Sequence, residues 1–296
     1  MPGDTANEQQ PGDTAQCRRL LQMVAEADHR WTTAALEAAV SRQLHLPRKS
    51  VRRLIRRLVT AGELAYAYEH GCTFLEPSFQ RPVRIGSRIV LVPHGQNAAG
   101  DPMMIPVFLQ AGAAFGSGQH PTTRLALRGI EWAVARFSLA AVAQEGKPDV
   151  LDVGTGSGVL LIAALALGLS SGVGLDTDPC ARFEARANLC CNHLTSRAAV
   201  EDGDMEQLGE LRFSLIAANL RYPTLSQLAK ALFERTRPGG AVVLSGVRTA
   251  EAEDLRGGYE AAGFTPCWEA VEKGWVGLVF GKPGGGSPEG MARTRS

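Results

Sequence analysis

The chain has 296 residues, of which 45% are hydrophobic and 21% are charged, and these proportions exclude a fibrous or largely disordered protein. An average domain has roughly 100–200 residues, so the length predicts two domains. Lysine and arginine number 31 against 30 acidic residues, so the net charge does not by itself indicate a nucleic-acid or membrane partner.

The two ends of the chain and its cysteines lead us to expect a cytoplasmic protein. Residues 1–15 are acidic and amide-rich where a signal peptide needs a basic and then an apolar stretch, so we predict a disordered tail. The Gly/Pro/Ser-rich residues 283–296 predict a flexible tail, and no stretch approaches the roughly 20 apolar residues of a membrane-spanning helix. No CxxC pair occurs, which predicts no metal site and reduced, mostly packed thiols at Cys17, Cys72, Cys180, Cys190, Cys191 and Cys267.

Residues 16–78 carry three helical patterns followed by two strand patterns. Apolar residues recur at helical spacing in the first part, and two short β-type runs surround a turn at Glu69–Gly71. The elements are expected at Cys17–Ala27, Thr32–Leu44, between Pro47 and Gly62, at Leu64–Tyr68 and at Cys72–Leu75. Three helices and a hairpin in this order resemble a winged-helix domain, so we predict an α+β domain of this kind.

The third of these helices is strongly basic. Its apolar residues follow helical spacing, so the other positions hold Arg48, Lys49, Arg52, Arg53, Arg56 and Arg57. If roughly four of them contacted phosphates, log affinity would fall with log salt concentration with a slope of about −3.6. Three interpretations stay open: contact with nucleic acid or the ribosome, docking of a protein, and a solvated helix face.

The rest of the chain predicts an α/β fold. Residues 79–110 are expected to form a β linker with one strand at Arg88–Val92, and residues 111–282 a larger domain. In that domain, strands are expected at 149–153, 172–176, 213–219, 241–246 and in two final runs, and helices at 157–168, 179–193, 223–235 and 249–262. Alternation of this kind needs crossover connections, so it predicts a Rossmann-like, mainly parallel sheet of seven strands with helices on both faces.

A glycine-rich turn, Asp152-Val-Gly-Thr-Gly-Ser-Gly158, follows the first of these strands. Glycines allow a tight turn and close approach of a ligand at the C-terminal edge of the sheet. A dinucleotide fingerprint would need glycine where Val159 stands, and a carboxylate before the loop suits a cation better than a pyrophosphate. The D-x-G-x-G-x-G pattern resembles the first motif of class I methyltransferases, which implies S-adenosylmethionine as the cofactor and Asp152 near its methionine end.

Three further carboxylates are candidates for the cofactor site. Asp176 ends the second strand of the domain about 20 residues after Gly154, where a ribose-binding acid is expected. Asp178 is the alternative, but its place before Pro179 favours a helix N-cap. Asp204 lies in a segment that resembles the adenine-contacting loop of methyltransferases, with a simple turn as the alternative.

The segment Ala114–Thr123 reads A-F-G-S-G-Q-H-P-T-T and closely resembles a segment of the PrmA family. Further similarities lie at Ala218–Leu220, Arg237–Gly240 (placed before the fifth strand), Leu244–Gly246 and Trp275–Val276. Together the resemblance covers about residues 80–282. It implies methylation of amino groups of a protein, either ribosomal protein L11 or a lysine or N-terminus of another protein.

The resemblance also implies roles for single residues. Asn219 would orient the nucleophilic nitrogen and His120 would line the substrate side, with a loop turn as the alternative for His120. Cofactor contacts would come from Phe115, Gly116, Thr123, Asp152, Gly154, Gly156, Asp176, Asp204 and Asn219, with Phe115 and Gly116 in a covering loop. The N-P-P-Y motif of enzymes that methylate planar amides or bases is absent, because Leu220-Arg221-Tyr222 follows Asn219.

The N-terminal domain leaves the substrate class open. PrmA proteins typically carry a different N-terminal domain that recognises the ribosomal protein, and residues 16–78 do not resemble it. Two alternatives therefore stand beside the protein methyltransferase. One is an RNA or small-molecule methyltransferase guided by the basic helix, and the other is a non-catalytic module that senses the cofactor, which the complete glycine loop disfavours.

Overall fold

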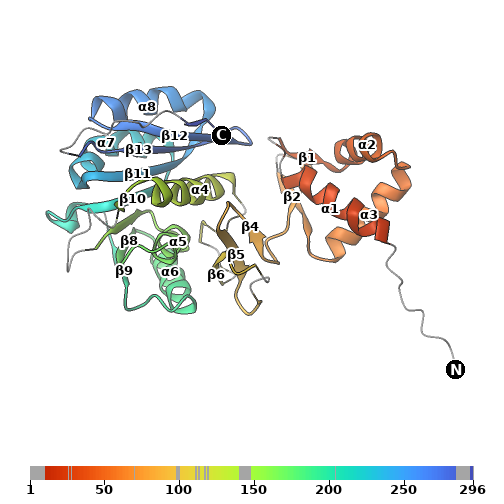
Figure 1. Cartoon of the computed structure of the whole chain (residues 1–296), viewed down its shortest axis with the longest axis horizontal. Helices are drawn as coiled ribbons and strands as arrows, with labels where there is room; N and C mark the ends of the chain where they lie inside the picture. The colour runs from red at the N-terminus through yellow and green to blue at the C-terminus, as the bar shows by residue number, and fades with distance from the viewer. Residues whose placement is uncertain are drawn as a thin grey trace. The chain divides into compact units, whose positions relative to one another are not determined.

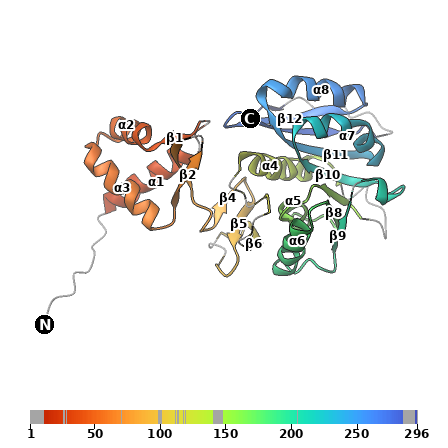
Figure 2. The same ribbon diagram turned by 180° about the vertical axis from the view of Figure 1, so that it is seen from behind.

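The computed structural model describes residues 11–284 and 294–295, apart from positions 26, 28, 70, 98–100, 111, 113, 117, 119, 140–147 and 204. The chain divides into two compact units, Met1–Arg81 and Pro82–Ser296 (Figures 1 and 2). Each unit has a hydrophobic core of its own. Residues 1–10 and most of 283–296, where the two tails are predicted, lie outside the described residues.

Unit 1 contains the three helices and the hairpin predicted from the sequence. Its elements are α1 (Pro11–Ala25), β1 (Trp31–Thr32), α2 (Thr33–Leu44), α3 (Arg48–Thr60), β2 (Leu64–Glu69) and β3 (Cys72–Pro77). The strands form an antiparallel sheet in the order β1-β3-β2. The helix α1 begins at Pro11, inside the stretch whose composition predicted a tail, and the winged-helix assignment stays an interpretation of this element order.

Local chemistry explains where the helices of unit 1 begin and end. The Thr32 hydroxyl accepts a hydrogen bond from the Ala35 N–H (3.3 Å) and so caps α2, which ends at His45 in the left-handed region (φ 52°). Pro47 precedes α3, where its fixed φ suits the start of a helix. Buried Leu20, Leu36, Leu54 and Leu75 join these elements in one core.

Unit 2 begins with a small sheet, where the sequence predicted a linker with one strand. Its strands are β4 (Val83–Arg84), β5 (Ile89–Pro93) and β6 (Ile105–Leu109), with β5 parallel to β6. The Asn192 side chain accepts from the Phe108 N–H (2.9 Å) and donates to the Phe108 carbonyl (2.7 Å). These bonds hold β6 against the end of helix α6 (Pro179–Cys191), so the segment that follows β6 is directed toward the larger sheet.

The larger sheet confirms the predicted mainly parallel, seven-stranded, Rossmann-like fold. Its strands lie in the order β14-β12-β13-β11-β10-β7-β8-β9, in which a two-residue β14 adds to the seven. The strands are β7 (Val150–Val153), β8 (Gly172–Asp176), β9 (Ala198–Asp202), β10 (Phe213–Asn219), β11 (Thr236–Arg248), β12 (Thr265–Glu272), β13 (Trp275–Gly281) and β14 (Thr294–Arg295). β7 to β11 run parallel, and β13 is antiparallel to both β11 and β12.

Helices cover both faces of this sheet (Figures 1 and 2). They are α4 (Pro121–Arg136), α5 (Val159–Ala166), α6, α7 (Tyr222–Arg235) and α8 (Ala252–Ala261), with short 3₁₀ turns η2 (Met205–Leu208) and η3 (Thr249–Glu251). Val242 and Leu244 belong to the core under α7 and α8, while a side chain at Gly129 of α4 would meet the alternate residue Val243. Successive residues of one strand therefore face opposite helix layers.

Besides the small sheet, three parts of unit 2 differ from the sequence prediction. β11 is longer than 241–246, so Arg237–Gly240 lies inside the strand and not before it. The edge strand β9 and the helix α4 were not predicted. β9 is short and largely exposed, which leaves little apolar periodicity to detect.

The cysteines are only in part as predicted. The six are outside disulfides, but the prediction that they are mostly packed was wrong. Cys17 and Cys267 are buried, whereas Cys72, Cys180 and Cys190 are exposed. Over the described residues, no helix is both long and apolar enough to cross a membrane, and no group of His, Cys, Asp or Glu side chains could hold a metal ion.

Candidate functional site

The C-terminal ends of β7, β8 and β10 meet at one edge of the larger sheet. Asp152 of β7 lies beside Gly174 of β8 on one side and Ala217 of β10 on the other. The chain passes from β7 to β8 in one direction and returns to β10 on the other side, so a topological switch point lies between β7 and β10. Open α/β sheets bind ligands in the crevice at such a point.

The glycine loop after β7 adopts a conformation that requires glycine. Gly154, Gly156 and Gly158 have φ values of 70°, 54° and 80°, in the left-handed region. A Cβ atom on Gly156 would lie 2.4 Å from the Phe115 carbonyl oxygen, and one on Gly154 would lie 2.5 Å from Leu220 Cδ2. The loop is therefore narrow on both sides, because protein atoms pack directly against its glycines.

Asp176 lies at the tip of β8, where the sequence predicted it. Its Oδ2 accepts a hydrogen bond from the Gly156 N–H (2.8 Å), and its Oδ1 accepts from the Asp178 N–H (3.0 Å). The carboxylate is thus joined to the glycine loop. Asp178 is the N-cap of α6, because its side chain accepts from the Cys180 N–H (2.8 Å), which confirms the prediction of a cap.

The carboxyl group of Asp152 is fully buried under the glycine loop. Its Oδ2 accepts from the Thr155 hydroxyl (2.7 Å) and from the Leu161 N–H (3.2 Å). Burial raises the pKa of Asp152 to about 7, the two hydrogen bonds oppose this rise, and the nearby Asp176 charge adds to it. A compensating positive charge would therefore favour the ionised carboxylate.

Buried polar atoms without a partner gather at this edge. Among the described residues, five buried side-chain polar atoms lack a hydrogen bond, and the one away from this edge is Arg237 Nε. The other four are Thr123 Oγ1, Asp152 Oδ1, Ser157 Oγ and Asn219 Oδ1. Buried polar groups in folded proteins are nearly always paired, so a cluster of unpaired ones indicates a polar ligand.

A second loop lies over the glycine loop. The Ser157 N–H donates to the Phe115 carbonyl oxygen (2.9 Å), and a Cβ on Gly116 (φ 111°) would lie 2.5 Å from Ser157 Oγ. The Ala114 N–H donates to Glu184 of α6 (2.9 Å), and the Phe115 ring is 52% exposed. The Phe115–Gly116 segment is thus fixed beside the glycine loop, while Phe115 stays about half exposed.

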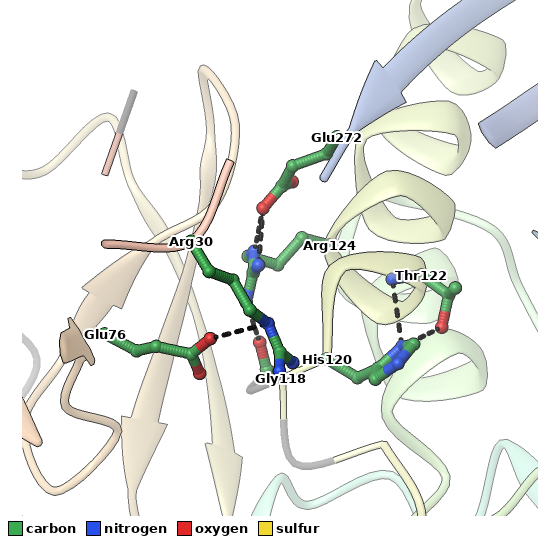
Figure 3. Close-up of polar contacts among 7 residues, drawn as sticks. All are labelled: Arg30, Glu76, Gly118, His120, Thr122, Arg124 and Glu272. Carbon is green, nitrogen blue, oxygen red and sulfur yellow. Dashed lines mark hydrogen bonds and ion pairs between the residues drawn. The ribbon is translucent and has the colours of Figure 1, made fainter. Parts of the chain in front are cut away.

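His120 performs a structural task at the start of α4. Its Nδ1 accepts from the Thr122 N–H (3.3 Å) and lies 2.8 Å from the Thr122 hydroxyl, so it caps the helix (Figure 3). In the same region, the Arg124 guanidinium donates to the Gly118 carbonyl (2.9 Å) and pairs with Glu272 (Figure 3). These contacts join the segment before α4 to the end of β12.

Three further side chains of this region were given no role in the site from the sequence. Trp275, at the start of β13, lies 4.9 Å from the His120 ring, between ring centroids. The Arg248 guanidinium stacks 3.7 Å from the Trp275 ring centroid, because the two residues pair across β11 and β13. Ser157, the third, stood inside the glycine motif without being singled out, and only its unpaired buried hydroxyl marks it.

Most predicted site residues therefore come to one edge of the sheet. They are Phe115, Gly116, Thr123, Asp152, Gly154, Gly156, Asp176 and Asn219, with the His120 ring 5.4 Å from the Phe115 ring. Asp204, predicted to contact adenine, lies outside the described residues, and so do Ser117 and Gln119 of the covering segment.

A family model and curated proteins that match this chain carry the same description. Residues 77–283 match a family model described as ribosomal protein L11 methyltransferase (PrmA). A protein of that name from Polynucleobacter necessarius subsp. necessarius is 36% identical over 198 residues, which cover 67% of this chain and 57% of that protein. Another from Cupriavidus metallidurans is 37% identical over 202 residues, 68% of this chain and 61% of the relative.

Among solved structures, a ribosomal protein L11 methylase from Lactobacillus delbrueckii subsp. bulgaricus is similar, with a TM-score of 0.58 and 26% identity. The match covers 69% of this chain and 99% of that one. The chain spans less than two thirds of the length of the two curated relatives. Residues 1–76 lie outside the matched family region.

Proposed function

The chain belongs to the PrmA family of ribosomal protein L11 methyltransferases, and from this we propose that it transfers a methyl group from S-adenosylmethionine to an amino group of a protein. Ribosomal protein L11 is the acceptor that we expect. The observation that carries the proposal is the set of unpaired buried polar atoms around the glycine loop, above all Asp152 Oδ1 and Asn219 Oδ1.

The residues at the sheet edge fit this cofactor. The buried Asp152 carboxylate suits the positively charged methionine end, because a nearby positive charge offsets the cost of ionising a buried carboxyl group. Asp176 is the proposed ribose ligand and Thr123 a further contact, while Gly154 and Gly156 allow the tight turn of the loop. Asp204, outside the described residues, stays a proposed adenine contact. When bound, the cofactor supplies an electrophilic methyl group on a sulfonium.

The acceptor amine needs orientation and a dry environment more than acid–base chemistry. Asn219 Oδ1 is buried and unpaired, so it can accept an N–H of a neutral amine and direct the nitrogen lone pair. A lysine titrates near 10.4 and an α-amino group near 8, and a desolvated site favours the neutral amine in both cases. We assign His120 to the substrate side and Phe115–Gly116 to the exclusion of water.

The proposal is tested by labelling. The full chain is incubated with cofactor carrying a radioactive methyl group, first with purified ribosomal protein L11 and then with a lysate digested separately by protease and nuclease. We expect label on L11 and label that protease removes. Label lost only to nuclease would contradict a protein acceptor, and cofactor binding without any transfer would favour the sensing module.

A further inference from the structure

The exposed side of α3 in unit 1 carries positive charge and no acidic residue. The buried positions of the helix lie on one side and are Val51, Leu54, Ile55 and Leu58. Lys49, Arg53 and Arg56 are exposed, and helical spacing puts them on the opposite side. Like charges four residues apart, such as Lys49 and Arg53, destabilise a helix, so a bound polyanion would relieve a repulsion within α3.

Arg52 differs from its basic neighbours, although the sequence grouped it with them. Its Nε and Nη2 donate to the two carboxylate oxygens of Glu37 in α2, each at 2.8 Å. The pKa of the buried Glu37 is lowered chiefly by this hydrogen-bonded pair, with smaller contributions from the charges of Arg48 and Arg56. Arg52 therefore joins α2 to α3, and its charge is compensated within the fold.

Two other cations of unit 1 are also compensated. Arg30 pairs with Glu76 (3.2 Å, Figure 3) and Arg81 with Glu63 (2.8 Å). Within the part of the chain that the structure describes, no ion pair engages Lys49, Arg53 or Arg56. Among the described residues, Arg18, Arg19 and Arg42 of α1 and α2 have no ion pair either, so α3 is distinguished by having three such cations on one side of a single helix.

Two exposed aromatic rings lie in the same unit. Tyr66 and Tyr68 of β2 are 51% and 77% exposed, which is unusual for such large side chains. Tyr66 pairs with Leu75 across the hairpin, and directly paired residues share one face of the sheet. Leu75 is buried in the core formed with α3, so both tyrosines project on the helix-bearing side of the sheet.

We propose that the exposed side of α3 (Lys49, Arg53 and Arg56, with Arg48 at its flank) and the exposed rings of Tyr66 and Tyr68 on β2 contact one bound RNA. The basic side chains match the phosphate backbone, and the rings can stack on unpaired bases, which RNA loops present and a DNA duplex does not. The choice of RNA also rests on the proposed function, because a ribosomal protein acts beside RNA. Unit 1 would then bring the catalytic unit to its acceptor.

The charge component is tested with the full chain by fluorescence anisotropy. The probes are a labelled RNA stem-loop and a DNA duplex of the stem sequence, titrated between 50 and 200 mM salt. About four phosphate contacts predict a slope of log affinity against log salt near −3. The triple variant K49Q/R53Q/R56Q is expected to reduce this slope to about −1.

The matched control removes the same charge elsewhere in unit 1. Arg18, Arg19 and Arg42 are exposed on α1 and α2, so R18Q/R19Q/R42Q lowers the net charge equally. We expect its slope to stay near the wild-type value, and circular dichroism verifies the fold of both variants. Equal losses in the two triple variants, or no RNA binding at 50 mM salt, would overturn the proposal.

The aromatic component separates RNA from DNA. The variant Y66A/Y68A is expected to weaken RNA binding by about tenfold or more, with the salt slope unchanged and DNA binding unaffected. DNA bound as tightly as RNA, with no effect of the tyrosines, would show that the assignment to RNA is wrong. All variants are expected to keep the wild-type affinity for the cofactor. A failure of the proposed methyl transfer can therefore be told apart from a failure of RNA binding.

Discussion

Asp152 is a single residue that couples cofactor binding to pH. Its pKa is raised by burial from 3.8 to about 7, and one carboxylate oxygen has no partner. A positively charged ligand needs the ionised form, so affinity is expected to rise with pH up to about 7 and then level off. We expect binding about 20-fold tighter at pH 7.5 than at pH 5.5 by calorimetry. The same pH dependence in Asp152→Asn would contradict this assignment.

The contribution of the same carboxyl group to the stability of the cofactor-free protein falls with pH, whereas cofactor affinity rises. A folded-state pKa above the unfolded value means that the folded protein binds the extra proton, so the contribution to stability is complete below about pH 4. It is lost as the pH rises toward 7, where the buried group must ionise. Without cofactor, Asp152→Asn is therefore expected to unfold at a higher temperature than wild type at pH 8. A lower unfolding temperature for the variant would show that ionisation of the buried carboxyl group does not destabilise the fold.

Asp176 is expected to be essential for cofactor binding. It is the proposed ribose ligand and also holds the Gly156 N–H, so Asp176→Ala removes two roles at once. Hydrogen bonds to a charged group contribute about 1.5–3 kcal/mol each, which predicts at least about 100-fold weaker binding by calorimetry. Asp178→Ala is the control: it removes the α6 cap at a cost of about 1 kcal/mol and leaves the affinity unchanged. Wild-type affinity in Asp176→Ala would show that the ribose contact lies elsewhere.

Asn219 is expected to act on the rate of methyl transfer. Its Oδ1 has no partner within the protein, so Asn219→Leu leaves no buried group newly unpaired. Loss of amine orientation predicts a kcat reduced about 100-fold in a steady-state methylation assay. Ser245, its register neighbour on β11, bonds the Val276 carbonyl (3.0 Å), so Ser245→Ala costs stability but is expected to keep kcat. Equal kcat in both variants would remove Asn219 from the mechanism.

Among the secondary-structure elements, β11 depends on a buried ion pair at its beginning. Arg237 Nη1 contacts Asp149 (3.1 Å) and the Ser214 hydroxyl (2.9 Å), so it joins β11 to the starts of β10 and β7. The Arg237 and Asp149 side chains are 3% and 2% exposed, so neither charge has solvent to compensate it. The Arg-Pro-Gly-Gly sequence at 237–240 is typical of a turn and was predicted to precede the strand. This contact explains why the strand includes these residues.

Breaking this pair is expected to destabilise the sheet strongly. Arg237→Met leaves the Asp149 charge buried without its partner, which costs about 3–5 kcal/mol in urea unfolding. The double variant Arg237→Met/Asp149→Leu removes both charges and is expected to recover part of that loss. A double variant no more stable than the single one would show that packing, and not charge, dominates at this position.

For the whole molecule, the two separate cores predict two thermal transitions. Cofactor at 100 times its Kd should stabilise the transition of residues 82–296 by about 2.7 kcal/mol and leave the other unchanged. Leu54 is 3% exposed in the core of unit 1, so Leu54→Ala should lower the free energy of unfolding of unit 1 by about 2–5 kcal/mol. Scanning calorimetry measures both, and a single transition that responds to both changes would contradict independent units.

Patterns that depend on near neighbours in the chain were predictable. The glycine loop, Asp176 at a strand end and the Asp178 cap all follow from residues within a few positions of one another. The small sheet formed by β5 and β6, the edge strand β9 and the full length of β11 were not, because strand pairing joins residues far apart in the sequence. Trp275 beside His120 is a contact of the same long-range kind.

By itself, the sequence determined the α/β fold, the position of the glycine loop and the family to which the chain belongs, since these depend on local spacing and composition. Only the tertiary structure decided that Asp152 and Asn219 carry unpaired buried oxygens and that Arg52 is compensated by Glu37. The physical reason is that burial and pairing belong to the environment of a side chain. Distant segments create that environment when they pack together.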